Sequence, residues 1–138
     1  MTDTRFTLPV RIYYEDTDAG GVVYHANYLR FMERARTEWL RNMGYDLDVV
    51  ACDDNLMFVV HAIKINYHKP ARLNDLLDVS AQLVRMRRAT LDIEHRVCLN
   101  SALLCEATVS LVTVKADSFK PCPMPTTMKE ELSNWIQS

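Results

Sequence analysis

The first regular stretch of alternating residues predicts a β-strand. Over residues 5–14 every second side chain is apolar or aromatic, as in a strand that buries one face. Pro9 has no backbone N–H to donate, so we expect this strand to lie near an edge of its sheet. The apolar face consists of Phe6, Leu8, Val10, Ile12 and Tyr14.

The longest helical pattern runs from about Val23 to Met43. Its apolar side chains form a stripe wide enough to predict a helix that is enclosed on most sides. Gly44 stands where a glycine commonly ends a helix. Asp46 is a candidate cap for a short second helix that extends to about Asp53. The stripe contains Val22, Ala26, Leu29, Met32, Trp39, Leu40 and Met43.

Four long strand patterns follow, with no helical pattern between them. The connections at 87–89 and 100–101 are short, which predicts antiparallel hairpins. A Pro-rich stretch then leads into a C-terminal helix, for which Thr127 and Glu130 fit a capping box. The strands are predicted at residues 57–67, 76–87, 90–99 and 103–115. The inward side of the last helix would carry Met128, Leu132, Trp135 and Ile136.

This order of elements predicts one α+β domain over residues 1–138. Strands without intervening helices exclude a doubly wound parallel sheet. One apolar helix and one sheet favour a sheet that curls around the helix. A chain of 138 residues is long enough to bury a core of this kind.

Composition narrows the classes of partner. The net charge of −2 gives no broad basic field for nucleic acid. The uncharged apolar runs are too short for a membrane span, and the first residues have no apolar signal region, so we expect a cytoplasmic protein. The absence of a C-x-x-C pair predicts reduced thiols. The cysteines are Cys52, Cys98, Cys105 and Cys122.

The loop from Glu15 to Gly21 carries the candidate chemistry. It holds two aspartates, Asp16 and Asp18, and ends in Gly20-Gly21 just before the long helix. A helix N-terminus offers unpaired N–H groups and partial positive charge, so an acid beside it suits attack on a carbonyl. Spacing alone leaves a second interpretation open, in which these acids only cap the turn or the helix.

Other chemistries fit the sequence less well. The pattern Asp16-x-Asp18-x-Gly20 is similar to a calcium loop, but its twelfth position is Asn27 where a Glu is needed. We therefore expect no metal site. No G-x-S-x-G motif is present for a serine hydrolase. His61 and His95 lie on apolar strand faces, and we interpret them as core or interface histidines.

A long motif in this region resembles a known family. The run Y-x-D-T-D-x-x-G-x-V-Y-H-x-N-Y, followed by E-x-A-R, is similar to the hotdog-fold acyl-CoA thioesterases of the 4-hydroxybenzoyl-CoA thioesterase class, in particular the Tol-Pal-associated (YbgC-type) branch. A Y-x-x-P-A-R-L turn at residues 67–73 extends the resemblance over nearly the whole chain. The motif positions are Tyr14, Asp16, Thr17, Asp18, Gly21, Val23, Tyr24, His25, Asn27, Tyr28, Glu33, Ala35 and Arg36.

The resemblance implies roles for five residues. Asp18 would attack the thioester or activate water, and the backbone N–H of His25 would polarise the thioester carbonyl. The side chains of His25 and Tyr14 would belong to the catalytic set. Arg87 and Arg88 would lie near the phosphates of CoA. From the residues alone, Tyr14 can equally pack with an exposed hydroxyl, and the arginines can equally form a solvated turn.

The resemblance also implies a function and an assembly. We expect a hotdog fold that hydrolyses short to medium aliphatic acyl-CoA without metal or organic cofactor, as a homotetramer built from two dimers. Two alternatives stay open. One is another hotdog enzyme acting on acyl thioesters, such as a dehydratase, and the other is a binding partner of acyl carrier protein or lipid synthesis. The Tol-Pal likeness implies a link to the cell envelope and names no substrate.

Overall fold

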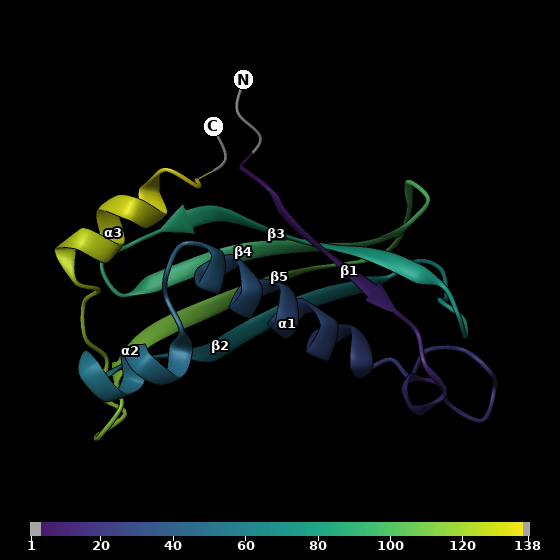
Figure 1. Ribbon diagram of the computed structural model, residues 1–138, viewed down its shortest axis with the longest axis horizontal. Coiled ribbons are helices and arrows are strands. Elements are labelled where there is room, and N and C mark those ends of the chain that lie inside the picture. Colours follow the sequence, from purple (N-terminus) through teal and green to yellow (C-terminus); the bar gives the residue numbers. More distant parts are fainter. Residues whose placement is uncertain (1–3, 137–138) are drawn as a thin grey trace.

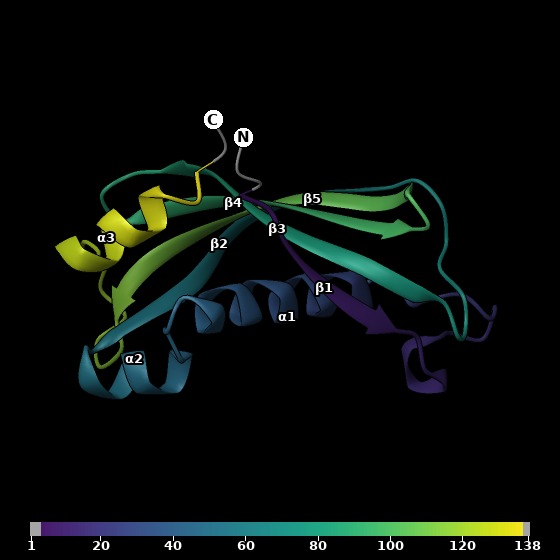
Figure 2. The same cartoon turned by 45° about the horizontal axis from the view of Figure 1, so that its top comes forward.

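A five-stranded antiparallel sheet curves around one long helix, as the computed structural model of residues 4–136 shows (Figures 1 and 2). The strand order is β1-β3-β4-β5-β2. This is the hotdog arrangement and the α+β class expected from the sequence. The elements are β1 (Phe6–Arg11), a 3₁₀ turn η1 (Tyr14–Asp16), α1 (Asn27–Asn42), α2 (Leu47–Asp53), β2 (Leu56–Tyr67), β3 (Leu76–Met86), β4 (Thr90–Leu99), β5 (Ala102–Lys115) and α3 (Thr126–Ser133).

The strand register lines up the apolar residues of one sheet face. Leu8 pairs with Val79, Val79 pairs with Val97, and Val97 pairs with Cys105. Because side chains alternate between faces along each strand, this register directs a continuous apolar layer at the helix. β1 is an edge strand, which confirms the position expected from Pro9.

The helix α1 fills the hollow of the sheet. Phe31, Met32, Ala35 and Trp39 recur at helical spacing and are at most 1% exposed. Gly44 follows the helix with a φ of 95°, the left-handed conformation expected of a C-terminal glycine. The predicted apolar stripe is therefore confirmed, and the curved sheet covers it. Enclosure on most sides is wrong for one chain, because Arg30, Glu33 and Arg34 on the other face of the helix are exposed.

The start of α1 differs from the sequence expectation. The helix begins at Asn27, four residues after Val23. Val23 instead forms an isolated bridge with Thr17, and its N–H donates to the carbonyl of Ala71 at 2.9 Å. Tertiary pairing of an extended segment has overridden the helical pattern here.

The end of the first strand was also predicted wrongly. β1 stops at Arg11, and Tyr14 opens the 3₁₀ turn with 80% of its surface exposed rather than facing the core. The carboxylate of Asp16 accepts a hydrogen bond from the N–H of Tyr13 at 2.8 Å, which stabilises the turn in place of a longer strand.

The N-terminal caps of the two short helices differ from the prediction. Asp46 is the N-cap residue of α2 but makes no capping hydrogen bond through its side chain. α3 has Pro125 at its N-cap, so the predicted box of Thr127 and Glu130 is wrong. Met128 and Leu132 are buried as expected. The other two inward residues, Trp135 and Ile136, follow the helix and are partly buried against the core.

The two histidines interpreted as core or interface residues differ in burial. His95 is fully buried, and its Nδ1 lies 3.0 Å from the carbonyl of Ser80. His61 is exposed on β2, beside a register shift between Val60 and Ala62, so a core position in this chain is wrong for it. Within residues 4–136, no helix combines the length and the apolar character that crossing a membrane requires.

Candidate active site

The loop that carries Asp18 lies at one end of the molecule, between η1 and α1 (Figure 1, right). The carboxylate is exposed, and its Oδ1 accepts a hydrogen bond from the N–H of Gly20 at 2.8 Å. The backbone N–H of Asp18 donates to the carbonyl of Val22 at 2.9 Å. No partner occupies Oδ2 among the residues that the structure describes. One oxygen therefore fixes the side chain, and the other is available for chemistry.

Both glycines of the loop are needed for this geometry. A Cβ added to Gly20 would lie 3.2 Å from Oδ1 of Asp18, which is tighter than an ordinary van der Waals contact. Gly21 has a φ of 80°, a conformation that L side chains rarely adopt. The Gly-Gly pair thus permits the close approach of the backbone to the carboxylate.

A buried asparagine ties the loop to the helix. The side-chain amide of Asn27 donates to the carbonyl of Asp16 at 2.9 Å, and the N–H of Tyr24 donates to the same oxygen at 2.9 Å. Asn27 is only 6% exposed. Sequence reasoning placed Asn27 in the motif but gave it no role. The backbone carbonyl of Asp16 thus holds the loop to the start of α1, while its carboxylate caps the preceding turn.

The segment before α1 presents unpaired backbone donors. The N–H of Asn27 donates to the carbonyl of Tyr24 at 2.9 Å, whereas in the described part of the chain no acceptor engages the N–H groups of His25 and Ala26. The ring of His25 lies 4.5 Å from the ring of Tyr24 and makes no hydrogen bond to Asp18 within those residues. Unpaired N–H groups at a helix start are suited to a developing negative charge on oxygen.

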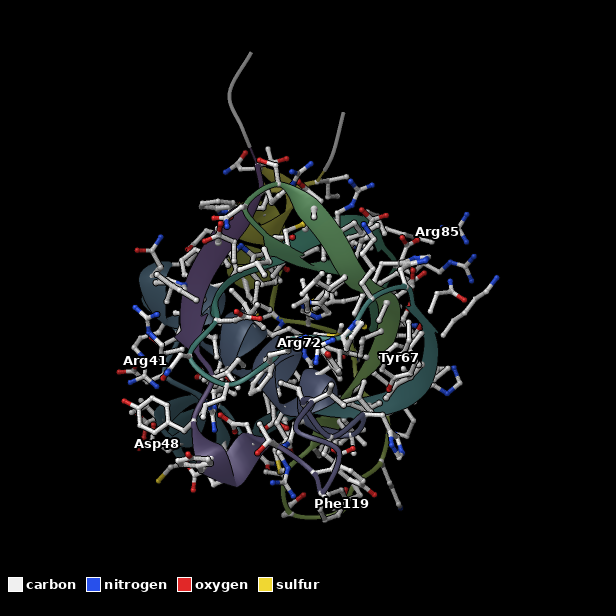
Figure 3. All side chains as sticks on the ribbon, turned by 90° about the vertical axis from the view of Figure 1, so that its right-hand side faces the viewer. Arg41, Asp48, Tyr67, Arg72, Arg85 and Phe119 are labelled. Carbon is white, nitrogen blue, oxygen red and sulfur yellow. The ribbon has the colours of Figure 1, made fainter. Side chains whose placement is uncertain are left out.

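The last strand residue of β2 reaches this segment. The hydroxyl of Tyr67 donates to the carbonyl of His25 at 2.8 Å. Partial burial raises the pKa of Tyr67, with smaller contributions from Cys105 and Tyr28, so the hydroxyl keeps its proton. Figure 3 looks onto this end of the molecule, where Tyr67 and Arg72 are labelled. Sequence analysis did not single out Tyr67 as functional, because only the fold brings it to His25.

Tyr14 lies in the turn before the Asp18 loop. With Arg11, Leu73 and Asn74 it borders an open hollow of about 730 Å³. Neither Asp18 nor His25 is among the residues that line this hollow. Within one chain the tyrosine is therefore near the loop in sequence but faces a separate depression.

The two candidate arginines lie elsewhere. Arg87 and Arg88 occupy the exposed connection between β3 and β4, and the carbonyl of Arg88 accepts the N–H of Met124 at 3.2 Å. This connection is at the α3 end of the sheet, opposite the Asp18 loop (Figure 1). The length of β3, roughly 35 Å at the usual rise per residue, separates the two ends. A single chain does not bring these arginines to Asp18.

No group of three or more His, Cys, Asp or Glu side chains in residues 4–136 is arranged to hold a metal ion. The four cysteines are free, and Cys105 is buried. Burial raises the pKa of the Cys105 thiol to about 12, with a smaller contribution from Glu106, so this thiol is not activated.

Comparison with known proteins gives consistent matches. Residues 12–136 match the sequence model of the thioesterase-like superfamily. The chain is 44% identical over 129 residues to the acyl-CoA thioesterase YbgC of Haemophilus influenzae, covering 94% of this chain and 95% of that protein. It is 42% identical over 132 residues to the acyl-CoA thioester hydrolase YbgC of Escherichia coli O157:H7, covering 95% and 98%.

Solved structures match the fold. A 1,4-dihydroxy-2-naphthoyl-CoA thioesterase from Synechocystis has a TM-score of 0.86 to this chain at 21% identity, covering 94% of this chain and 96% of that one. At this identity the likeness shows the architecture alone.

Proposed function

The chain belongs to the thioesterase-like superfamily and is an acyl-CoA thioester hydrolase, and we propose that Asp18 and the N–H groups before α1 carry out its reaction. The family expected from the motif is confirmed. The observation that carries the proposal is the joining of two parts: the Asp18 loop is tied through the Asp16 carbonyl to the segment that holds the unpaired N–H of His25. These hydrogen bonds thereby keep the carboxylate and the proposed oxyanion site in a fixed position relative to each other.

Thioester hydrolysis needs both of these groups. The thioester carbonyl oxygen accepts hydrogen bonds from the N–H groups of His25 and Ala26, which stabilise the negative charge that develops on it. In one route a carboxylate oxygen of Asp18 attacks the carbonyl carbon, the C–S bond breaks, CoA leaves as thiolate, and water hydrolyses the mixed anhydride. In the other route Asp18 takes a proton from water, and the water oxygen attacks the carbonyl carbon. The C–S bond then breaks as the Asp18 carboxyl gives that proton to sulfur, so CoA leaves as thiol.

Two side chains have supporting roles in this proposal. The imidazole of His25 lies next to the donor segment, where it can orient substrate or water. Tyr14 directly precedes the loop and exposes its hydroxyl, which suits a contact with substrate. The backbone and side-chain roles of His25 are separable, because substitution of the imidazole leaves the N–H in place.

Completion of the site requires a second copy of the chain. Arg87 and Arg88 are at the wrong end of their own sheet, so we propose that they approach the CoA phosphates of a neighbouring subunit, where charge-assisted hydrogen bonds would hold them. The edge strand β2 offers an apolar surface for pairing of copies, with Val60 44% and Ile63 43% exposed. The proposed assembly is a homotetramer built as a dimer of dimers.

The substrate proposal is a short to medium aliphatic acyl group. The YbgC relatives are named as acyl-CoA hydrolases and support the CoA carrier. Acyl carrier protein presents the same kind of thioester and is the second carrier to test. The proposed setting is the cytoplasm, in keeping with four free cysteines, with a link to the Tol-Pal system of the cell envelope.

Thiol release from a panel of acyl-CoA substrates tests the proposal. The panel runs from acetyl to palmitoyl and includes benzoyl and 4-hydroxybenzoyl groups, and Asp18→Asn is assayed beside the unchanged protein. We expect a chain-length optimum in the short to medium range and loss of turnover in Asp18→Asn with an unchanged melting temperature. Near-normal rates in Asp18→Asn would exclude the proposed role of the carboxylate.

A further inference from the structure

We propose that Tyr67 is a positioning residue for the thioester carbonyl, because its hydroxyl holds the His25–Ala26 peptide in the orientation that presents the N–H donors to substrate. The inference rests on the proposed function and adds to it a residue from a distant strand. Tyr67 ends β2, and its hydroxyl donates to the carbonyl of His25 at 2.8 Å.

The helix itself does not engage this carbonyl. His25 lies one residue before Ala26, the N-cap residue of α1, so its carbonyl is outside the hydrogen-bond ladder of the helix. Here the N–H of Leu29 donates to the carbonyl of Ala26 at 3.2 Å. Among residues 4–136 the Tyr67 hydroxyl is the hydrogen-bond donor to the His25 carbonyl, which the helix leaves without an internal partner.

This hydrogen bond acts on the donors through the peptide plane. The carbonyl of His25 and the N–H of Ala26 belong to one rigid amide group. Donation to the carbonyl oxygen polarises the amide and strengthens its N–H as a donor. The preceding amide, which carries the N–H of His25, is held in the same way, because its Tyr24 carbonyl accepts the N–H of Asn27 at 2.9 Å.

The surroundings of Tyr67 keep its hydroxyl in place. Its ring meets the ring of Tyr28 edge-on, with centroids 5.6 Å apart, and the ring of His25 with centroids 6.4 Å apart. The backbone of Tyr67 pairs with Cys105 of β5. Such fixed support from a strand lowers the reorganisation that the donors would need during the reaction.

The substitution Tyr67→Phe removes the hydroxyl and keeps the ring. We expect kcat to fall roughly tenfold, the effect of losing one supporting hydrogen bond, with KM changed less than about twofold. Tyr45→Phe is the matched control, because Tyr45 lies beyond the far end of α1 and its hydroxyl faces Glu131. Equal kcat values in Tyr67→Phe and the unchanged enzyme would overturn the inference.

A spectroscopic readout separates positioning from a general structural role. Isotope-edited infrared spectra would follow the thioester C=O stretch of acyl-CoA bound to Asp18→Asn, with and without Tyr67→Phe. We expect a smaller shift to low frequency in the double variant, because the carbonyl is less polarised. An identical band in both would overturn the inference even if kcat fell. Turnover retained by Asp18→Asn would instead count against the proposed function, so the two failures are distinguishable.

Discussion

Nη1 of Arg36 on α1 lies 3.2 Å from Nε2 of His95 on β4, and both side chains are buried. Nδ1 of His95 faces the carbonyl of Ser80 and must donate to it. Nε2 therefore accepts from the guanidinium, and the imidazole is neutral. Burial lowers the pKa of His95 to about 3, and the positive charge of Arg36 contributes in the same direction.

This pair predicts a specific sensitivity to acid. The pKa of His95 is depressed in the folded state relative to about 6.5 in the unfolded chain, so the unfolded state binds the proton first. Stability should fall as pH decreases from about 6.5 to about 3, by at most about 1.4 kcal/mol per pH unit from this group. Urea denaturation at several pH values measures the slope.

The matched variants are His95→Gln and His61→Gln. The first should flatten the acid dependence, and the second should leave it unchanged because His61 is exposed. An acid slope that is the same in His95→Gln and the unchanged protein would show that carboxylates alone cause it.

Substitution of Gly20 should affect activity more than stability. In Gly20→Ala the new Cβ meets Oδ1 of Asp18 at 3.2 Å and displaces the carboxylate. A small misplacement of a reacting group can cost up to about a hundredfold in rate. Steady-state thiol release and a thermal melt would be measured on the same sample.

Gly44→Ala is the control for Gly20→Ala. Gly44 has a φ of 95° and no atom within 4 Å of an added Cβ. We expect a loss of about 1 kcal/mol in the free energy of unfolding from the strained backbone, with kcat unchanged. If Gly20→Ala lost only stability and Gly44→Ala lost only activity, the placement of Gly20 at the active site would be contradicted.

Asn27→Ala should weaken the connection between the Asp18 loop and α1. The carbonyl of Asp16 loses one of its two donors inside the protein. We expect the free energy of unfolding to fall by about 0.5–1.5 kcal/mol, the net contribution of one hydrogen bond, because the N–H of Tyr24 still donates to the Asp16 carbonyl; kcat should also fall. Asn134→Ala, at an exposed helix end, should change neither. Full activity in Asn27→Ala would show that the loop keeps its place without this bond.

The cysteines should differ in their reaction with an aromatic disulfide reagent at pH 8. Cys52 is exposed on α2, whereas the pKa of the buried Cys105 thiol is raised to about 12. Only the thiolate reacts, so Cys105 should react only after unfolding. Counting the released chromophore before and after adding guanidinium, with Cys52→Ser as control, measures this. Rapid reaction of Cys105 in the native protein would contradict its burial.

Local patterns predicted most helices and strands, because the spacing of apolar residues differs between a helix and a strand and is visible in the sequence. The alternation in residues 90–99 and the helical spacing of Phe31, Ala35 and Trp39 are visible without knowledge of any partner. Predictions failed where another segment competes for the backbone. The sequence pattern predicts a helical Val23, but pairing with Thr17 and Ala71 keeps this residue in an extended conformation. Tyr14 continues the alternation of β1, but the turn closed by Asp16 ends the strand first.

The sequence by itself determined the class of fold and the family, and it predicted the loop of Asp18 as the candidate site, because a strand period, a helix period and a contiguous motif are properties of neighbouring residues. Only the tertiary structure decided which distant groups meet there. Tyr67 reaches the carbonyl of His25 because β2 runs back along α1 to the helix start. Arg87 and Arg88 are carried to the opposite end because β3 runs away from it. Sheet register and direction set these distances, and no local pattern encodes them.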